Sequence, residues 1–183
     1  MVRELLTQRI LNLNFLLQEK EKIEDCYTLI LETILNDNKI LLCGNGEGAS
    51  ISNSLENIFV SKFKKATKNI QSISLNSNSS LITSIASESS FDDIFKKQIE
   101  NIGKKGDLLI AFCPVGTSKN IIEAIKQAKF QNIKVILLTG QTKLNYNIDL
   151  EINAIGNSDE QIFEMHNVIV HTVCELIENN FLS

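Results

Sequence analysis

The chain has 183 residues, of which 43% are hydrophobic, and a formal net charge of −4. This length and composition fit one globular α/β domain over residues 1–183, and the acidic balance gives no basic surface for nucleic acid. The first residues are charged and lack a signal-peptide core, and no apolar run approaches the ~20 residues of a membrane span. We therefore expect a cytoplasmic protein that binds neither nucleic acid nor a membrane.

Apolar residues at helical spacing predict two helices within residues 1–36, ahead of the first strand. Strands and helices then alternate through residues 37–183. We predict strands at residues 39–43, 70–75, 107–112, 134–139 and 148–152, and helices at 50–63, near 81, 92–102, 118–130 and 159–180. Strands separated by helices favour a doubly wound parallel sheet covered on both faces, with the N-terminal and C-terminal helices available for oligomer contacts.

Two strand-to-helix loops carry the strongest functional signal. In each, an apolar run is followed by small residues, from Gly44 to Gly48 in the first loop and from Gly116 to Ser118 in the second. Such loops let backbone N–H groups converge on a phosphate at a helix N-terminus. Glycine also suits an ordinary turn, but two such loops at one edge of a parallel sheet strengthen the phosphate interpretation. The candidate phosphate-binding residues are Asn45, Gly46, Glu47, Gly48, Gly116, Thr117 and Ser118.

Four cysteines, Cys26, Cys43, Cys113 and Cys174, show no metal-ligand spacing. Their apolar surroundings favour reduced thiols in the core. Cys113 is the exception, because it falls in the second loop, at a position that we expect to face the ligand.

These motifs, in this order and spacing, resemble the sugar isomerase (SIS) fold, in the branch that holds phosphoheptose isomerase and the DnaA-initiator-associating protein. The resemblance covers nearly the whole chain and rests on residues 39–46, 84–86, 91–95, 106–110, 116–118, 135–140, 164–166 and 174–178. It implies a homotetramer with sites formed between subunits. It also implies interconversion of sedoheptulose 7-phosphate and a glycero-manno-heptose 7-phosphate, commonly with zinc.

Aldose–ketose isomerisation needs a base that removes a carbon-bound proton and a group that returns protons. Alignment with the family places its catalytic glutamate on Ile58, a histidine on Ser54 and a glutamine on Phe163. Isoleucine cannot take a proton, and serine and phenylalanine are poor zinc ligands. The chain departs from the family's catalytic set, and we predict no zinc site and no other cofactor.

His171 alone matches the family's second catalytic position and is the candidate catalytic residue. A histidine without its partners also fits a buried or interface position. His166 lies five positions earlier on another helix face, so the two histidines do not form a metal pair. Glu56 is turned by about 200° from Ile58 around the helix, which favours a surface carboxylate.

The substrate-binding positions have also changed. Ser87 and Glu88 stand where the family has a substrate-contacting Asn-Asp pair, so the acid is kept and the amide is lost. Glu47 stands where the family has a glycine, and a carboxylate near a phosphate is repulsive by roughly 1 kcal/mol or more. The second loop keeps its glycine and last serine but loses earlier hydroxyls. Lys119, at the start of its helix, would offset part of the repulsion.

The sequence leaves three functions open. The first is a non-catalytic SIS tetramer, similar to the DnaA-initiator-associating protein, that keeps sugar-phosphate binding and acts on a protein partner such as the replication initiator. Phe181 and Leu182 are then candidate partner contacts. The second is a phosphoheptose isomerase whose base has moved to His171 or Glu88. The third is a sugar-phosphate sensor that depends on Ser118.

Overall fold

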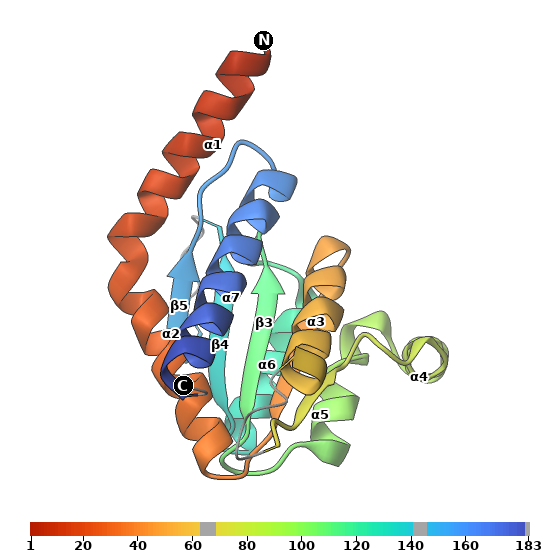
Figure 1. The fold of residues 1–183 in the computed structure, drawn as a ribbon. Coiled ribbons are helices and arrows are strands. Elements are labelled where there is room, and N and C mark those ends of the chain that lie inside the picture. The colour runs from red at the N-terminus through yellow and green to blue at the C-terminus, as the bar shows by residue number, and fades with distance from the viewer. Residues whose placement is uncertain (63–68, 141–145, 182–183) are drawn as a thin grey trace.

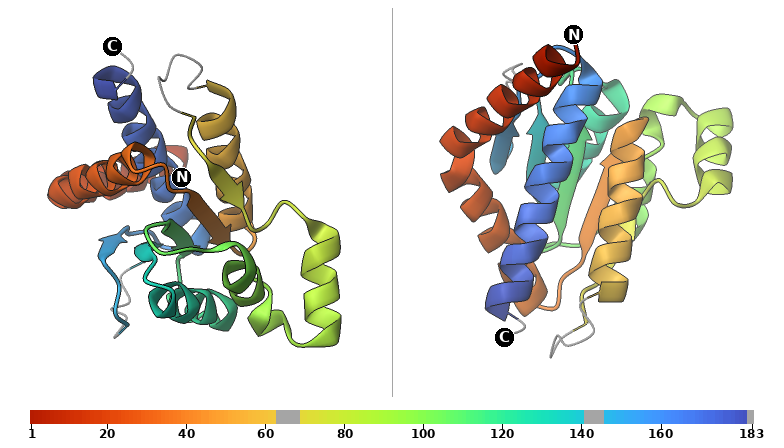
Figure 2. Two further views of the ribbon diagram at one scale, coloured as in Figure 1. Left: turned by 90° about the horizontal axis from the view of Figure 1, so that it is seen from below. Right: turned by 45° about the horizontal axis from the view of Figure 1, so that its top comes forward.

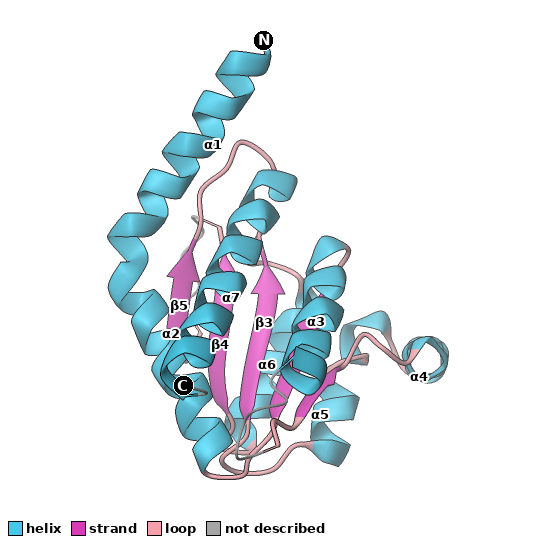
Figure 3. Ribbon diagram, viewed as in Figure 1, coloured by secondary structure: helices cyan, strands magenta, loops and turns pink. Residues whose placement is uncertain are grey.

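The computed structural model describes residues 1–62, 69–140 and 146–181. Its strands are β1 (Ile40–Gly44), β2 (Ser72–Ser74), β3 (Leu108–Cys113), β4 (Lys134–Thr139) and β5 (Leu150–Asn153). They form one parallel sheet in the order β2-β1-β3-β4-β5 (Figures 1 and 3). β1, β3 and β4 are almost wholly buried, because helices cover both of their sides, and their sequences are accordingly uninterrupted apolar runs. β5 lies at one edge and alternates buried with half-buried residues, as predicted.

Helices cover both faces of the sheet (Figures 1 and 2). Even-numbered residues of β1 and β3 pack against the first layer of helices and odd-numbered residues against the second, because successive strand residues point to opposite faces. The first layer is α2 (Lys20–Leu35), α3 (Glu47–Asn57) and α7 (Asp159–Phe181), and the second is α5 (Lys96–Ile102) and α6 (Lys119–Phe130). The predicted α/β class with a parallel sheet flanked by helices is confirmed.

Two helices lie outside these layers. α1 (Val2–Leu16) runs into the short helix η1 (Leu17–Glu19), and its N-terminal turns extend beyond the sheet (Figure 1). α4 (Ser79–Glu88), followed by η3 (Phe91–Asp93), stands to the side of the sheet (Figure 2). None of the helices in the described ranges combines the length and apolarity of a membrane span.

Most predicted elements are shifted by only one or two residues in the structure, and three change further. The helix predicted at 50–63 begins at Glu47, because Gly46, with a φ of 54°, turns the chain directly into it. It passes into a π-helical turn, η2 (Ile58–Lys62). The strand predicted at 70–75 is limited to β2. The helix predicted at 92–102 is split into η3 and α5, because the Ser90 hydroxyl accepts from Asp92 N and starts a separate short turn.

Asp107 fixes the edge of the sheet opposite the two loops. Its buried carboxylate accepts hydrogen bonds from Lys39 N at 3.0 Å and Lys104 N at 2.9 Å, and it forms an ion pair with Lys39 Nζ. A buried carboxylate needs such partners, because leaving water without them is costly. Asp107 therefore ties the starts of β1 and β3 together.

Candidate functional site

Two adjoining clefts lie at the carboxyl ends of the central strands, where parallel sheets commonly bind ligands. The loop cleft, of about 330 Å³, is bounded by the loops after β1 and β3 and by the start of α7. The helix cleft, of about 500 Å³, runs between α3 and α7. Glu47 and Glu160 line both clefts, so the two share a wall.

The loop after β1 is compact. A Cβ atom on Gly44 would lie 2.5 Å from Gly48 C, so the absence of side chains lets the strand end contact the first turn of α3. The amide of Gly48 donates to Asn45 O at 2.9 Å, and that of Ala49 donates to Gly46 O at 3.1 Å. Two of the amides that would hold an anion are therefore already hydrogen-bonded within this segment.

The loop after β3 is braced by the end of β4. Gly116 N donates to Cys113 O at 3.0 Å, which closes a turn in which Gly116 has a φ of 69°. Gly140 N donates to Pro114 O at 2.9 Å. The Ser118 hydroxyl does not cap α6 and lines the loop cleft, where it can donate to a ligand.

A reciprocal amide pair joins the two loops. Asn45 Nδ2 donates to Asn120 Oδ1 at 2.9 Å, and Asn120 Nδ2 donates to Asn45 Oδ1 at 2.8 Å. Asn120 is only 2% exposed, so it holds the loop after β1 against the start of α6. Asn76, from the loop after β2, donates to Gly44 O at 2.9 Å and accepts from Gly44 N at 3.2 Å. Sequence reasoning missed Asn120, because its partner is far away along the chain.

The loop cleft is negatively charged. Glu47, Asp159 and Glu160 line it, and the described residues around it include no Lys or Arg. A hydrogen bond from the Ser158 hydroxyl, followed by one from the backbone of Glu160 itself, lowers the pKa of Glu160 below its ordinary value, so this carboxylate is ionised at neutral pH. Lys119, expected to offset Glu47, is exposed and lines neither cleft.

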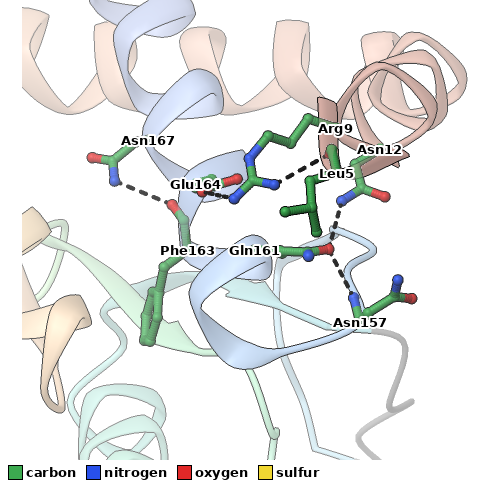
Figure 4. Close-up of polar contacts among 8 residues, drawn as sticks. All are labelled: Leu5, Arg9, Asn12, Asn157, Gln161, Phe163, Glu164 and Asn167. Atoms are coloured by element: carbon green, nitrogen blue, oxygen red, sulfur yellow. Dashed lines mark hydrogen bonds and ion pairs between the residues drawn. The ribbon is translucent and has the colours of Figure 1, made fainter. Parts of the chain in front are cut away.

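Polar contacts join α1 to α7, which supplies one wall of the helix cleft (Figure 4). Arg9 Nη2 lies 2.9 Å from Glu164 Oε1, so the carboxylate that lines the cleft is paired from behind. Asn12 Nδ2 donates to Gln161 Oε1 at 3.3 Å, and the same oxygen accepts from Asn157 N at 3.1 Å. Arg9 carries no local signal in the sequence, because Glu164 is 155 residues away.

Comparison with known proteins shows the family to which this architecture belongs. A family model for the SIS domain matches residues 8–140. The phosphoheptose isomerase of Aliarcobacter butzleri is 35% identical over 162 residues, which cover 87% of this chain and 86% of the relative. That of Helicobacter pylori is 32% identical over 164 residues, with coverages of 88% and 85%. The chain belongs to the phosphoheptose isomerase family.

Solved structures agree with this assignment. The phosphoheptose isomerase of Neisseria gonorrhoeae superposes with a TM-score of 0.87 at 27% identity, over 97% of both chains. That of Francisella tularensis gives a TM-score of 0.88 at 24% identity over 98% of this chain and 97% of the other, which supports the fold. Because the fold is shared, the side chains of the two clefts decide what this family member does.

Phe163 is the residue on which the resemblance to the phosphoheptose isomerase family places a glutamine. Its ring is 7% exposed and forms a wall of the loop cleft. A Cβ atom on Gly48 would lie 3.2 Å from Phe163 Cε1 and 3.1 Å from Phe112 Cβ, so Gly48 makes room for this aromatic wall. On its other side the ring packs edge-on against His166, with centroids 5.7 Å apart.

Ile58 and Ser54 are the two residues of η2 and α3 on which the resemblance places the family's glutamate and histidine. Ile58 is half-buried and packs against the core beneath α3 and α7. Ser54 is exposed and lines the helix cleft. Neither side chain can serve as a base near neutral pH, and only the hydroxyl of Ser54 offers a donor or acceptor to a ligand.

The two histidines occupy different environments. His171 is exposed on α7, four residues after Asn167 and seven after Glu164, so it lies on the helix face that lines the helix cleft. His166 is fully buried, and its Nε2 lies 3.3 Å from Thr139 O. Burial lowers the pKa of His166 to about 4, so the ring is neutral at pH 7. His166 and His171 thus lie in different environments on α7, and the expectation that they form no metal pair stays a prediction.

Other predicted site residues lie apart from the clefts. Ser87 and Glu88 are exposed on α4, where Glu88 Oε1 accepts from the Ser84 hydroxyl at 3.3 Å, and they line neither cleft. Thr117 is exposed beside Ser118 and Gly116 is buried under the loop. Glu56 is half-buried and lines neither cleft.

Cys113 was expected to face the ligand, and this is wrong, because it is the last residue of β3 and its side chain points into the core behind the sheet. Leu182 lies outside the described residues, and Phe181 is described only as the last residue of α7. Their proposed partner contact stays a prediction.

Proposed function

We propose that this member of the phosphoheptose isomerase family is a binding or regulatory protein without isomerase activity. The observation that carries the proposal is the packing of Phe163 between Gly48 and His166. A glutamine at this position can coordinate a metal ion or a substrate hydroxyl, whereas a buried phenyl ring offers no donor or acceptor. Because the phenyl ring is tightly packed in the wall of the cleft, it cannot move aside to let a neighbouring polar side chain take its place.

The residues present do not fit zinc. Of the four positions that the resemblance assigns to metal and proton transfer, only His171 keeps a nitrogen ligand. Ile58 and Phe163 have no ligand atom, and the Ser54 hydroxyl is a poor zinc ligand. A site with one protein ligand does not hold zinc, so we derive no step through it.

A sugar phosphate remains the ligand class proposed for the loop cleft. The Ser118 hydroxyl and the two helix starts support it. The carboxylates of Glu47, Asp159 and Glu160 oppose it, so we expect weak binding. Such a protein would act by binding a protein partner, as the related DnaA-initiator-associating protein binds the replication initiator.

An isomerase with a relocated base is the second candidate. The names of the relatives favour it, and so does the place of His171 on the face of α7 that lines the helix cleft. It requires that turnover depend on His171 or on Glu88, which lies away from both clefts in a single chain. A sugar-phosphate sensor would instead show binding that is lost in Ser118→Ala.

The test is conversion of sedoheptulose 7-phosphate, followed by proton NMR with and without added zinc. We expect no product from wild-type protein that circular dichroism shows to be folded. Saturable product formation that disappears in His171→Ala would overturn the proposal and establish the relocated base. Product that persists in His171→Ala and disappears in Glu88→Ala would overturn the proposal as well and identify Glu88 as the base. Product that persists unchanged in both variants would come from a contaminating isomerase and would be removed by further purification.

A further inference from the structure

The loop after β1 contains the only Asn-Gly step in the sequence, Asn45–Gly46, and both residues line the loop cleft. An asparagine followed by glycine is prone to deamidation, because glycine has no side chain that would hinder attack of its backbone nitrogen on the preceding side-chain amide. Gly46 is exposed, and a Cβ atom built on it would meet no atom within 4 Å. Among the described residues, Gly46 N donates to no partner, whereas Gly48 N and Ala49 N are hydrogen-bonded within this segment. The attacking nitrogen is therefore free.

The Asn45 side chain, in contrast, is held by both of its amide atoms. The reciprocal pair with Asn120, at 2.9 Å and 2.8 Å, engages Nδ2 and Oδ1 of both residues. Asn120 is itself fixed, because it is 2% exposed and its Oδ1 also accepts from Ile121 N at 3.0 Å. Attack on Asn45 Cγ turns a planar carbon tetrahedral and releases Nδ2, so it breaks the planar pair whatever the starting distance. The hydrogen bonds to Asn120 thus oppose the reaction.

We propose that Asn45 is a deamidation site and that Asn120 restrains its conversion. In this reaction Gly46 N forms a bond to Asn45 Cγ and closes a succinimide ring, and Nδ2 leaves as ammonia with the proton that Gly46 N gives up. Water then opens the ring. Cleavage of the bond between the nitrogen and Cγ gives aspartate, and cleavage of the bond between the nitrogen and the backbone carbonyl carbon of Asn45 gives isoaspartate. One water is consumed, one ammonia is released, and nothing is oxidised or reduced.

Either product changes the loop cleft. A carboxylate replaces the amide beside Glu47, in a cleft that Asp159 and Glu160 already make acidic. The donor to Asn120 Oδ1 is lost, because a carboxylate only accepts hydrogen bonds, so the loop after β1 is held less firmly against the start of α6. Isoaspartate also routes the main chain through its Cβ, which lengthens the turn before α3. Deamidation is thus an irreversible change in the charge and geometry of this cleft, and the inference does not rest on the proposed function.

The test is the rate of deamidation of the full-length protein in mildly alkaline buffer, followed by peptide mass mapping across Asn45. Folded wild type should convert slowly, and wild type unfolded in urea should convert much faster. Asn120→Ala, shown by circular dichroism to be folded, should convert about tenfold faster than folded wild type or more, because Asn45 has lost both hydrogen bonds. Asn120→Asp keeps the acceptor for Asn45 Nδ2 and loses only the donor, so its rate should lie between those of wild type and Asn120→Ala.

Asn12→Ala is the matched control for a general loss of stability. Asn12 is also a fully buried asparagine with both amide atoms hydrogen-bonded, to Gln8 and Gln161, but it lies on α1. This variant should convert at the wild-type rate. Equal rates in folded wild type and Asn120→Ala would overturn the proposal, as would an equal acceleration in Asn12→Ala, which would assign the reaction to unfolded chains. So would folded wild type that converts as fast as the unfolded chain, or folded Asn120→Ala that does not convert at all.

Discussion

His166 makes the folded protein sensitive to mild acid. Burial lowers its pKa from an ordinary value of 6.5 to about 4 in the folded state. The unfolded chain therefore takes up this proton at a higher pH than the folded protein does. The free energy of unfolding should fall as the pH drops below about 6.5 and should level off below about 4.

The size of the effect follows from the pKa difference. One pKa unit corresponds to 1.36 kcal/mol, so the full shift amounts to about 3 kcal/mol. Between about pH 7.5 and pH 5, where folded His166 is still neutral and unfolded His166 is mostly charged, the loss is about 2 kcal/mol. Since domains are commonly stable by only 5–15 kcal/mol, such a loss is readily measured.

Urea denaturation at these two pH values isolates the contribution of His166. His166→Phe keeps an aromatic ring against Phe112 and Phe163, and His166→Leu provides a second, aliphatic replacement. Both variants remove the contact of His166 Nε2 with Thr139 O, which keeps the hydrogen bond from Ala154 N, so any cost of this loss is the same at both pH values. Wild-type protein should lose about 2 kcal/mol more than either variant on acidification. Equal losses in wild type and variants would refute the assignment of a neutral, buried His166.

Three other substitutions test the framework of the site. Asp107→Ala should cost about 3–5 kcal/mol of unfolding free energy in urea denaturation, because it leaves Lys39, whose side chain is only 12% exposed, without its ion-pair partner. A cost below about 1 kcal/mol would contradict the ion pair. Asn120→Ala should cost about 1–3 kcal/mol, because it removes the partner of Asn45; stability equal to wild type would show that the amide pair does not hold the loops together. Glu47→Gln should tighten sugar-phosphate binding about fivefold in calorimetric titration, because it relieves roughly 1 kcal/mol of repulsion between the carboxylate and the phosphate. Unchanged or weaker binding would mean that the phosphate does not lie near Glu47.

The fold was largely predictable from local sequence signals. The short apolar runs of β1, β3 and β4, which alternate with helical patterns along the chain, indicated buried parallel strands. The glycines at 44, 46 and 116 marked the turns that follow β1 and β3. The exact start of α3 was missed by three residues, because the positive φ of Gly46 lets the helix begin earlier than the apolar spacing suggests.

The site was only partly predictable, because its decisive contacts join distant segments. Asn45 and Asn120 meet through the tertiary fold, as do Arg9 and Glu164, and neither pair has a local pattern. The charge of the loop cleft also depends on bringing Asp159 and Glu160 next to Glu47. Cys113 was misplaced, because one step along a strand moves a side chain from the ligand side to the core.

Solvent deuterium exchange tests the absence of catalysis most directly, because it detects proton abstraction even without net product. Sedoheptulose 7-phosphate would be incubated in D2O with folded wild-type protein and with His171→Ala, and its carbon-bound hydrogens followed by NMR. With Ile58 and Phe163 in place of the family's glutamate and glutamine, we expect no deuterium to enter above the rate without protein. Deuterium that enters with the wild type and not with His171→Ala would contradict the account and identify His171 as part of a working isomerase site.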